Sequence, residues 1–246
     1  MIISKPNERD KMTLARLLQL ASPALPVGAY AYSQGLEWAV EAHSVNSEAS
    51  ALAWILDQLE WNIGRYEAPM LLRMMAAWRD LASAATPVGA SDTPSGQLNM
   101  QYLASRETAE LRAETLQMGY SMTRLLNDLG DFPQPLLDQI ITDESQTGAS
   151  YLSVWTCAAA HWQIADEDAL TTWLWSWAEN QTMAALKAVP LGQAAGQRLL
   201  QEIGRRLPAI VEQALALDED SFSNFAPAFA IACCRHETQY SRLFRS

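Results

Sequence analysis

Apolar residues recur along this chain at steps of three and four, and this spacing limits the fold more than any other feature of the sequence. The clearest case lies in segment 107–129, where one stripe is formed by Leu111, Thr115, Met118, Met122, Leu125 and Leu129. Such spacing places side chains on one face of an α-helix. No segment shows the sustained alternation of apolar and polar residues that indicates a half-buried strand. The sequence therefore predicts an all-α fold.

Residues that start or stop helices predict where two of these helices are bounded. The helix over 107–129 is expected to end at Gly130, because glycine readily adopts the left-handed conformation that terminates helices. Another helix is expected to open after Asn46 or Ser47, which are good N-caps, and to resume after a break near Pro69. Its apolar face is formed by Ile55, Leu59, Ile63, Met70, Met74 and Trp78.

Three further helices are expected in the second half of the chain. The alanine-rich segment 148–163 permits close approach of neighbouring helices and is placed at the centre. The acidic run 166–168 opens the next helix, because negative charge stabilises the positive end of a helix dipole. One side of that helix carries Leu170, Trp173, Leu174 and Trp177. The last long helix spans 193–217, where Pro208 should kink or split it.

Length and composition predict one compact domain over residues 1–246. About half of the residues are apolar, 49% by count, which is enough for a substantial core. Residues 1–12 are expected to be flexible. Segment 83–98 is rich in proline, glycine and serine and is expected to form a mobile surface loop. Residues 235–246, called the tail below, mix charged and aromatic side chains and are expected to bind a partner.

The charge of the chain disfavours two classes of partner. With 28 acidic and 17 basic residues, the net charge of −11 repels nucleic acid and anionic lipid, so neither nucleic acid nor a membrane is expected as a partner. No apolar run reaches the roughly 18 residues of a membrane span, and the start of the chain lacks a signal-peptide pattern. A cytoplasmic location is therefore expected. Cys157, Cys233 and Cys234 are expected to be reduced thiols, because adjacent cysteines pair only through a strained ring.

One short motif raises the alternative of a serine hydrolase. Residues 31–35, AYSQG, differ from the G-x-S-x-G nucleophile elbow only at the first position, and His161 or His236 is available as a base for Ser33. An elbow, however, needs a strand before the serine and a helix after it, and no strand–helix alternation surrounds this motif. The sequence therefore leaves two hypotheses. The first is a protein that binds other proteins and has no catalytic residues, and the alternative is a serine hydrolase that uses Ser33.

Two further patterns resemble cofactor sites without matching them. Cys233, Cys234 and His236 offer three soft ligands, but adjacent cysteines diverge on a helix and no C-x-x-C is present, so no metal is expected. Gly192 and Gly196 fit neither the Walker A loop nor the dinucleotide fingerprint. Close helix packing explains these glycines better, and no cofactor is expected.

The two ends of the chain carry side chains typical of binding hot spots. Segment 17–41 is apolar and rich in proline and glycine, and it contains two tyrosines. The tail interleaves arginines with aromatic and aliphatic residues, which dominate protein interfaces: Arg235, Tyr240, Arg242, Leu243, Phe244 and Arg245. A short amphipathic helix docked on its own domain is the other interpretation of this tail.

Four blocks in these regions together resemble the UreF family of urease accessory proteins. The blocks are LASPALPVGAYAYSQGLEWAVE, SRETAELRAE, LKAVPLGQAAGQRLL and RHETQYSRLFRS, and they span nearly the whole chain. The resemblance implies an all-α fold without enzyme activity. It also implies a homodimer that bridges UreD (also called UreH) and the GTPase UreG. In that family the complex docks on apo-urease, UreABC, where UreG releases nickel and UreF controls when GTP is hydrolysed.

The resemblance also assigns partner-binding roles to particular residues. The surface that meets the GTPase is implied for Gly28, Tyr32, Gly35, Glu37 and Lys187. A tail that becomes ordered on complex formation with UreD is implied for Arg235, His236, Glu237, Tyr240, Arg242 and Arg245. Ordering on binding is consistent with the polarity of this tail.

Overall fold

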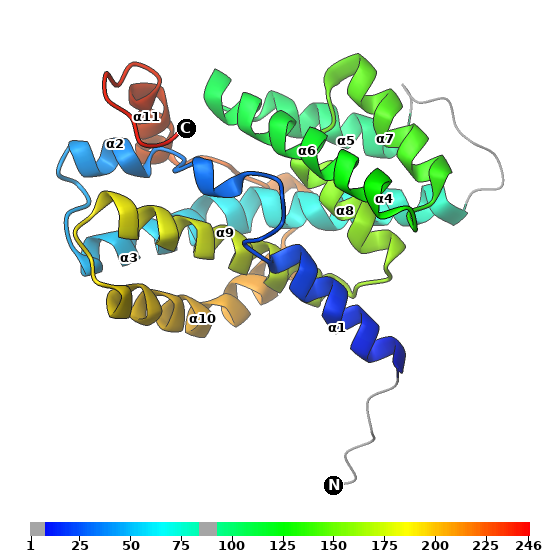
Figure 1. Ribbon diagram of the computed structural model, residues 1–246, viewed down its shortest axis with the longest axis horizontal. Helices are drawn as coiled ribbons and strands as arrows, with labels where there is room; N and C mark the ends of the chain where they lie inside the picture. Colours follow the sequence, from blue (N-terminus) through cyan, green and yellow to red (C-terminus); the bar gives the residue numbers. More distant parts are fainter. Residues whose placement is uncertain (1–7, 84–92) are drawn as a thin grey trace, which may run out of the picture.

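The computed structural model describes residues 8–83 and 93–246, and within these ranges every regular element is a helix (Figure 1). The all-α prediction is confirmed. None of the described helices combines the length and apolar character that a membrane span requires. In chain order the elements are α1 (Glu8–Ala21), η1 (Ala29–Ala31), α2 (Leu36–Glu41), α3 (Glu48–Gln58), η2 (Leu59–Glu67), α4 (Ala68–Ser83), α5 (Pro94–Ala104), α6 (Ala109–Leu129), α7 (Gln134–Thr147), α8 (Tyr151–His161), α9 (Asp166–Ala188), α10 (Gln193–Ala216), η4 (Glu219–Ser221) and α11 (Pro227–His236).

Helix α8 lies at the centre of the molecule, as its alanine content predicts. Residues 152–160 are all buried, and the helix packs against α4 and α6. The small side chains allow these axes to approach closely. Gly119 in α6 serves the same purpose, because a Cβ at this position would lie 2.1 Å from the carbonyl oxygen of Ala149. The core is therefore built on close packing around one short helix.

Several predicted boundaries are found in the structure. Ser47 caps α3 by accepting a hydrogen bond from the backbone of Ser50, and Gly130 ends α6 in the left-handed conformation with φ of 72°. The acidic first turn of α9 begins at Asp166. Gly196 lies where α10 crosses α9, and a Cβ there would be 2.7 Å from a methyl group of Leu186. The packing role expected for Gly196 is thus confirmed. The same expectation was wrong for Gly192, where a Cβ would have no neighbour within 4 Å and which lies at the N-cap of α10.

Two predicted interruptions are absent. The chain stays helical from α3 through α4, and the expected break near Pro69 is replaced by η2, a π-helix over Leu59–Glu67. A π-turn widens the helix just before a residue that lacks a backbone donor, which lets the helix continue. Gly64 in this wide turn also meets α10, since a Cβ there would lie 2.9 Å from Ile210. Helix α10 likewise continues through Pro208 and is not split.

The structure describes parts of the three segments that the sequence singles out as flexible, mobile or partner-binding. Of the expected loop 83–98, residues 84–92 lie outside the described residues, but Pro94 begins α5, which Thr93 caps. Of the expected flexible segment 1–12, residues 1–7 lie outside the described residues, and α1 begins at Glu8. The tail, which was expected to become ordered on complex formation, is packed on the chain itself in this structure.

The arrangement of helices brings distant parts of the sequence to one end of the molecule. In Figure 1, α11 and the C-terminal end of the chain lie beside α2, and α6 starts close to them and runs toward α7 at the other end. Helix α11 packs on α2, and α2 packs in turn on α9. The two terminal segments singled out in the sequence therefore meet.

Candidate functional site

The tail folds back onto the loop that precedes α2. The backbone amide of Arg245 donates to the carbonyl oxygen of Ala31 at 2.8 Å. The carbonyl oxygen of Ser246 accepts from the amides of Ser33 and Gln34, at 2.7 and 3.1 Å. It also accepts from the Ser33 hydroxyl at 2.7 Å. These backbone contacts fix the position of the tail without depending on its exposed side chains.

Glu37, in the first turn of α2, binds the tail through a buried carboxylate. Its Oε1 accepts from the amide of Leu243 at 2.6 Å, and its Oε2 accepts from the amide of Phe244 at 3.0 Å. The Nε2 atom of His236 lies 3.3 Å from the same Oε2. A buried charge is tolerated only when it is paired and hydrogen-bonded, and Glu37 meets both conditions only with the tail in place.

His236 ends α11 between two carboxylates. Its side chain is 0% exposed, and its Nδ1 lies 2.7 Å from Oε2 of Glu110, which comes from α6. The other oxygen of Glu110 accepts from Arg242 at 2.5 Å. One buried imidazole thus connects α2, α6 and the tail.

Glu114, one turn further along α6, holds the last residue of the tail. Its carboxylate accepts from the Ser246 hydroxyl at 2.6 Å and from the side-chain amide of Gln34 at 2.7 Å. Gln34 is itself oriented by Trp177, whose indole nitrogen donates to it at 2.7 Å. Burial raises the pKa of Glu114 from 4.5 to about 7, although the hydrogen bonds from Ser246 and Gln34 oppose the shift.

A small cavity of about 90 Å³ lies next to Glu114 and Gln34. Its wall includes the ion pair between Arg106 and Glu67, at 2.6 Å, and several aromatic rings of α8 and α9. This volume suffices for water or for a very small molecule. Within the part of the chain that the structure describes, no three histidine, cysteine or carboxylate residues form a group that could hold a metal ion.

Lys187 joins the same region from the end of α9. The side chain is exposed, and its Nζ lies 5.7 Å from the ring centre of Tyr30 and 5.4 Å from that of Phe244. It also donates to the carbonyl oxygen of Tyr30 at 3.4 Å. A cation placed near two aromatic faces bridges the N-terminal loop and the tail.

The glycines of the N-terminal segment have different roles. Both Gly28 and Gly35 have positive φ, at 79° and 77°. Gly35 also lies directly against α11, since a Cβ there would be 3.0 Å from the backbone nitrogen of Cys233. Gly28 has no such neighbour within 4 Å. Only Gly35 is therefore required for the contact between α2 and α11.

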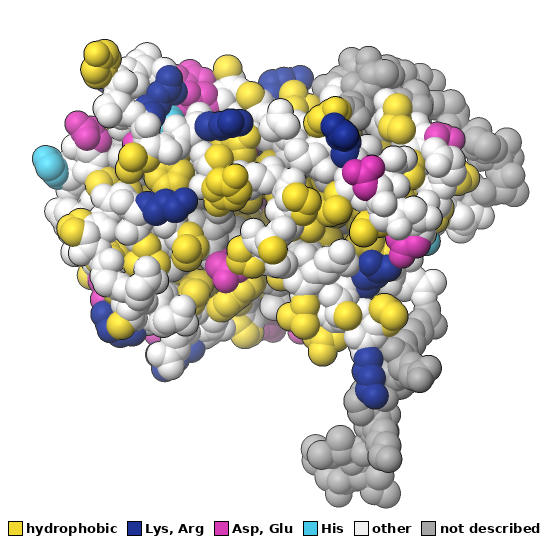
Figure 2. Space-filling model, in the orientation of Figure 1, with side chains coloured by type: hydrophobic (Ala, Val, Ile, Leu, Met, Phe, Trp, Pro, Cys, Tyr) yellow, Lys and Arg dark blue, Asp and Glu magenta, His cyan; other side chains and the backbone are white. Residues whose placement is uncertain are grey.

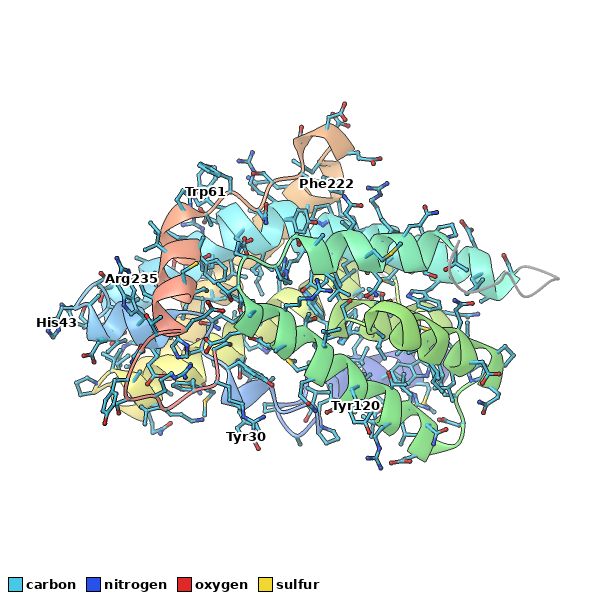
Figure 3. The ribbon with its side chains drawn as sticks, turned by 90° about the horizontal axis from the view of Figure 1, so that it is seen from above. Tyr30, His43, Trp61, Tyr120, Phe222 and Arg235 are labelled. Atoms are coloured by element: carbon cyan, nitrogen blue, oxygen red, sulfur yellow. The ribbon has the colours of Figure 1, made fainter. Side chains whose placement is uncertain are left out.

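The other residues singled out in the sequence divide into buried and exposed ones. Tyr32 is buried, which raises its pKa; Glu114 adds to the shift, and a hydrogen bond with Arg245 opposes it. Glu237 is exposed and accepts from the amide of Glu110 at 3.3 Å. Arg235 and Tyr240 are exposed, and Figure 3 shows Arg235 pointing outward from α11. The structure thus brings the N-terminal segment, Lys187 and the tail together.

The structure contradicts the elbow geometry that a hydrolase using Ser33 would need. Ser33 is fully buried beneath the tail, its hydroxyl donates to Ser246, and it accepts from the amide of Glu37 at 3.3 Å. Short helix η1 rather than a strand precedes it. The two cysteines next to His236 also diverge, because Cys233 is buried and Cys234 is exposed, and none of the three cysteines forms a disulfide.

Sequence reasoning missed the residues on α6 that receive the tail. Glu114 follows Leu111 by three positions and precedes Met118 by four, so it occupies the apolar stripe that predicted this helix. A carboxylate on a core-facing stripe signals a buried charge that needs partners. Glu110 lies one turn earlier and carries no comparable signal.

One face of the molecule presents this region to solvent. Tyr30, Tyr240 and Leu243 are exposed there together with Lys187 and Arg245. In Figure 2, dark-blue basic side chains lie among yellow apolar ones over the upper part of the face toward the viewer. Exposed aromatic and cationic side chains of this kind are typical of protein interfaces.

Fold and site together define an all-α protein whose tail is docked by buried carboxylates beside an exposed aromatic and cationic surface. The chain matches the UreF family over residues 45–204. It is 57% identical over 236 residues to the urease accessory protein UreF of Dechloromonas aromatica, covering 96% of this chain and 98% of that one. The corresponding protein of Azoarcus sp. is 55% identical over 238 residues, covering 96% of each chain. The bifunctional urease accessory protein UreEF of Bordetella bronchiseptica is 43% identical over 240 residues, which are 96% of this chain and 53% of that one. This chain belongs to the UreF family of urease accessory proteins.

Proposed function

We propose that this chain is a scaffold for nickel insertion into urease, which bridges UreD (UreH) and the GTPase UreG and regulates GTP-dependent delivery of nickel to apo-urease. It acts in the cytoplasm, as a homodimer within the complex, and the chemistry takes place on its partners. Membership of the UreF family supports the role in urease maturation. The relative whose printed name joins UreE and UreF supports work alongside other accessory proteins.

One observation carries the proposal of a binding scaffold. Three segments that are far apart in the sequence, residues 23–38, Lys187 and the tail, form one continuous region in the structure. Their buried members hold the region together, and their exposed members face solvent. A surface of exposed tyrosine, leucine and arginine side chains held in place by buried contacts is suited to binding a protein.

A pull-down against UreD and UreG, each alone and then together, tests this function. The informative variant is the double change Tyr240→Ala and Leu243→Ala, because both side chains are exposed and their loss leaves the tail backbone bonds intact. We expect loss of co-purification with at least one partner while the far-ultraviolet circular dichroism is unchanged.

Tyr120→Ala provides the matched control, since this exposed tyrosine lies on α6 away from Arg235 in Figure 3. It should keep full binding. Undiminished binding of both partners by the double variant would refute the tail surface as the interface. Activation of urease in cells by a Ser33→Ala variant should remain largely intact, because no catalytic serine is needed and the backbone amides of Ser33 and Gln34 still bind the carbonyl oxygen of Ser246.

A further inference from the structure

His236 has carboxylate oxygens at both ring nitrogens. Nδ1 lies 2.7 Å from Glu110 and Nε2 lies 3.3 Å from Glu37. A carboxylate only accepts hydrogen bonds, whereas a neutral imidazole has one donor and one acceptor nitrogen. A neutral ring would therefore direct a lone pair at one of the two carboxylates.

The other contacts of the two carboxylates favour their ionised forms. Both oxygens of Glu37 accept backbone N–H groups, from Leu243 and Phe244. The second oxygen of Glu110 accepts from Arg242. Hydrogen bonds to the charged form and a nearby cation both stabilise a carboxylate. The proton that satisfies the arrangement must then reside on the imidazole.

We propose that His236 is the positioning residue of the tail: as a doubly protonated imidazolium it links Glu37 to Glu110, and the tail is released when the ring loses a proton. This inference about attachment concerns the chain alone. Its consequence, pH-dependent capture of a partner, rests on the proposed function.

The charges around the ring explain why one proton has a large effect. Glu37 faces the ring from α2, Glu110 faces it from α6, and Arg242 of the tail reaches Glu110. Arg235 on α11 and Glu237 just after its end are exposed, and Cys233 on α11 is a buried thiol whose pKa is raised by burial. When the ring is doubly protonated, the positive charges of His236 and Arg242 balance the negative charges of the two carboxylates. Without the charge of His236, the buried group carries one uncompensated negative charge.

The sign of the effect follows from this balance. Attachment requires the protonated ring, so the attached tail is favoured at the acid end of the range and is lost as the pH rises. Glu114 acts in the same direction through Ser246, since burial raises the pKa of Glu114. Experiments must therefore separate the two groups.

The first test observes the ring directly. The chain contains three histidines, His43, His161 and His236, so their ring carbon signals can be assigned from single His→Gln variants. We expect the His236 signal to show the doubly protonated form whenever the tail is attached, and the signals of His43 and His161 serve as references within the same chain. A neutral His236 ring in a chain whose tail is still attached would overturn the proposal.

The second test measures the tail. A nitroxide spin label at Tyr240→Cys, in a Cys234→Ala background that leaves the other two thiols buried, reports its mobility. We expect a restricted label at low pH and a mobile one at high pH, because the doubly protonated ring holds the tail. His236→Gln should give a mobile label throughout. Glu110→Gln should give a restricted label with little pH dependence, because its amide can donate to a neutral imidazole.

Glu114→Gln is the control that separates the two titrating groups. It should retain the pH dependence of the label, since it leaves Glu37, His236 and Glu110 unchanged. If the dependence disappears in Glu114→Gln and persists in Glu110→Gln, the assignment to His236 is refuted. None of these measurements involves a partner, so they can fail while the pull-down succeeds, and the reverse also holds.

Discussion

The tail site is the region where Glu37, Glu110 and Glu114 bind the tail. The centre of the molecule and the tail site are both shielded from solvent, but different interactions stabilise them. Around α8 the contacts are apolar, and alanines and glycines let the helices approach. At the tail site, Glu37, Glu110 and Glu114 bind backbone amides, a hydroxyl, an imidazole and a guanidinium. Apolar packing depends little on pH or salt, whereas buried charges depend on their protonation and on every partner being present. We call the apolar core around α8 the body. The body should stay folded under conditions in which the tail detaches.

The largest expected effect concerns the body, the apolar core around α8. Trp155→Ala removes a side chain that is 1% exposed in α8 and packs edge-on against Trp173 at 5.4 Å. We expect the free energy of unfolding to fall by about 3–5 kcal/mol, as for other large-to-small core changes. Urea denaturation monitors this loss.

Trp61→Ala is the matched control, because that side chain is 55% exposed. Its effect should stay within about 1 kcal/mol. Equal losses in the two variants would show that α8 is not the apolar centre of stability.

The second prediction concerns the pH dependence of stability. The pKa of Glu114 rises from 4.5 to about 7 on folding, so the folded chain binds this proton more tightly than the unfolded chain. Its contribution is complete below about pH 4.5 and is lost as the pH rises through 7, up to about 3 kcal/mol. Glu114→Gln should abolish this loss, because Gln can still bond Gln34 and Ser246.

Denaturation at a series of pH values measures the difference between the wild type and this variant. The control is Glu41→Gln, which changes an exposed carboxylate at the end of α2. A wild type whose stability is flat across this range would contradict the buried, raised carboxylate.

The third prediction tests how Glu37 stabilises the attached tail. Glu37→Gln leaves the shape of the side chain but removes the charge that accepts from Leu243, Phe244 and His236. Charged hydrogen bonds contribute about 1.5–3 kcal/mol each, so we expect amide hydrogen exchange in residues 243–246 to accelerate at least about tenfold. Exchange in α8 should stay unchanged.

Mass spectrometry of the peptides that cover both regions makes this comparison within one sample. If α8 and the tail accelerate together, the tail is part of the same cooperative unit as the core, and the division into body and tail is wrong.

The sequence predicted the body better than the tail site, for a physical reason. Helix α6 follows from the spacing of its apolar residues and from Gly130, which are local signals. The pairing of Glu37 with His236 joins residues 199 positions apart, and nothing in either segment specifies the other. The resemblance named both residues, but only the fold shows that they bind each other and that α6 supplies Glu110. Of the missed residues, only Glu114 carried a signal, since it lies on the apolar stripe.

The smallest expected effect concerns the edge of the tail site, where a charged side chain contacts aromatic rings. Lys187 is exposed and lies near the rings of Tyr30 and Phe244, so its contribution to attachment is that of an exposed cation–π contact, about 0.5–1 kcal/mol. Lys187→Met keeps the aliphatic stem and removes the charge, so exchange in residues 243–246 should accelerate only about two- to fivefold.

High salt should weaken the effect of Glu37→Gln less than that of Lys187→Met, because exposed charges are screened more than buried ones. Lys11→Met, which changes an exposed lysine of α1, should change nothing. If Lys187→Met nevertheless abolishes partner capture, this lysine contacts the partner directly, because so small a loss of attachment cannot release the tail.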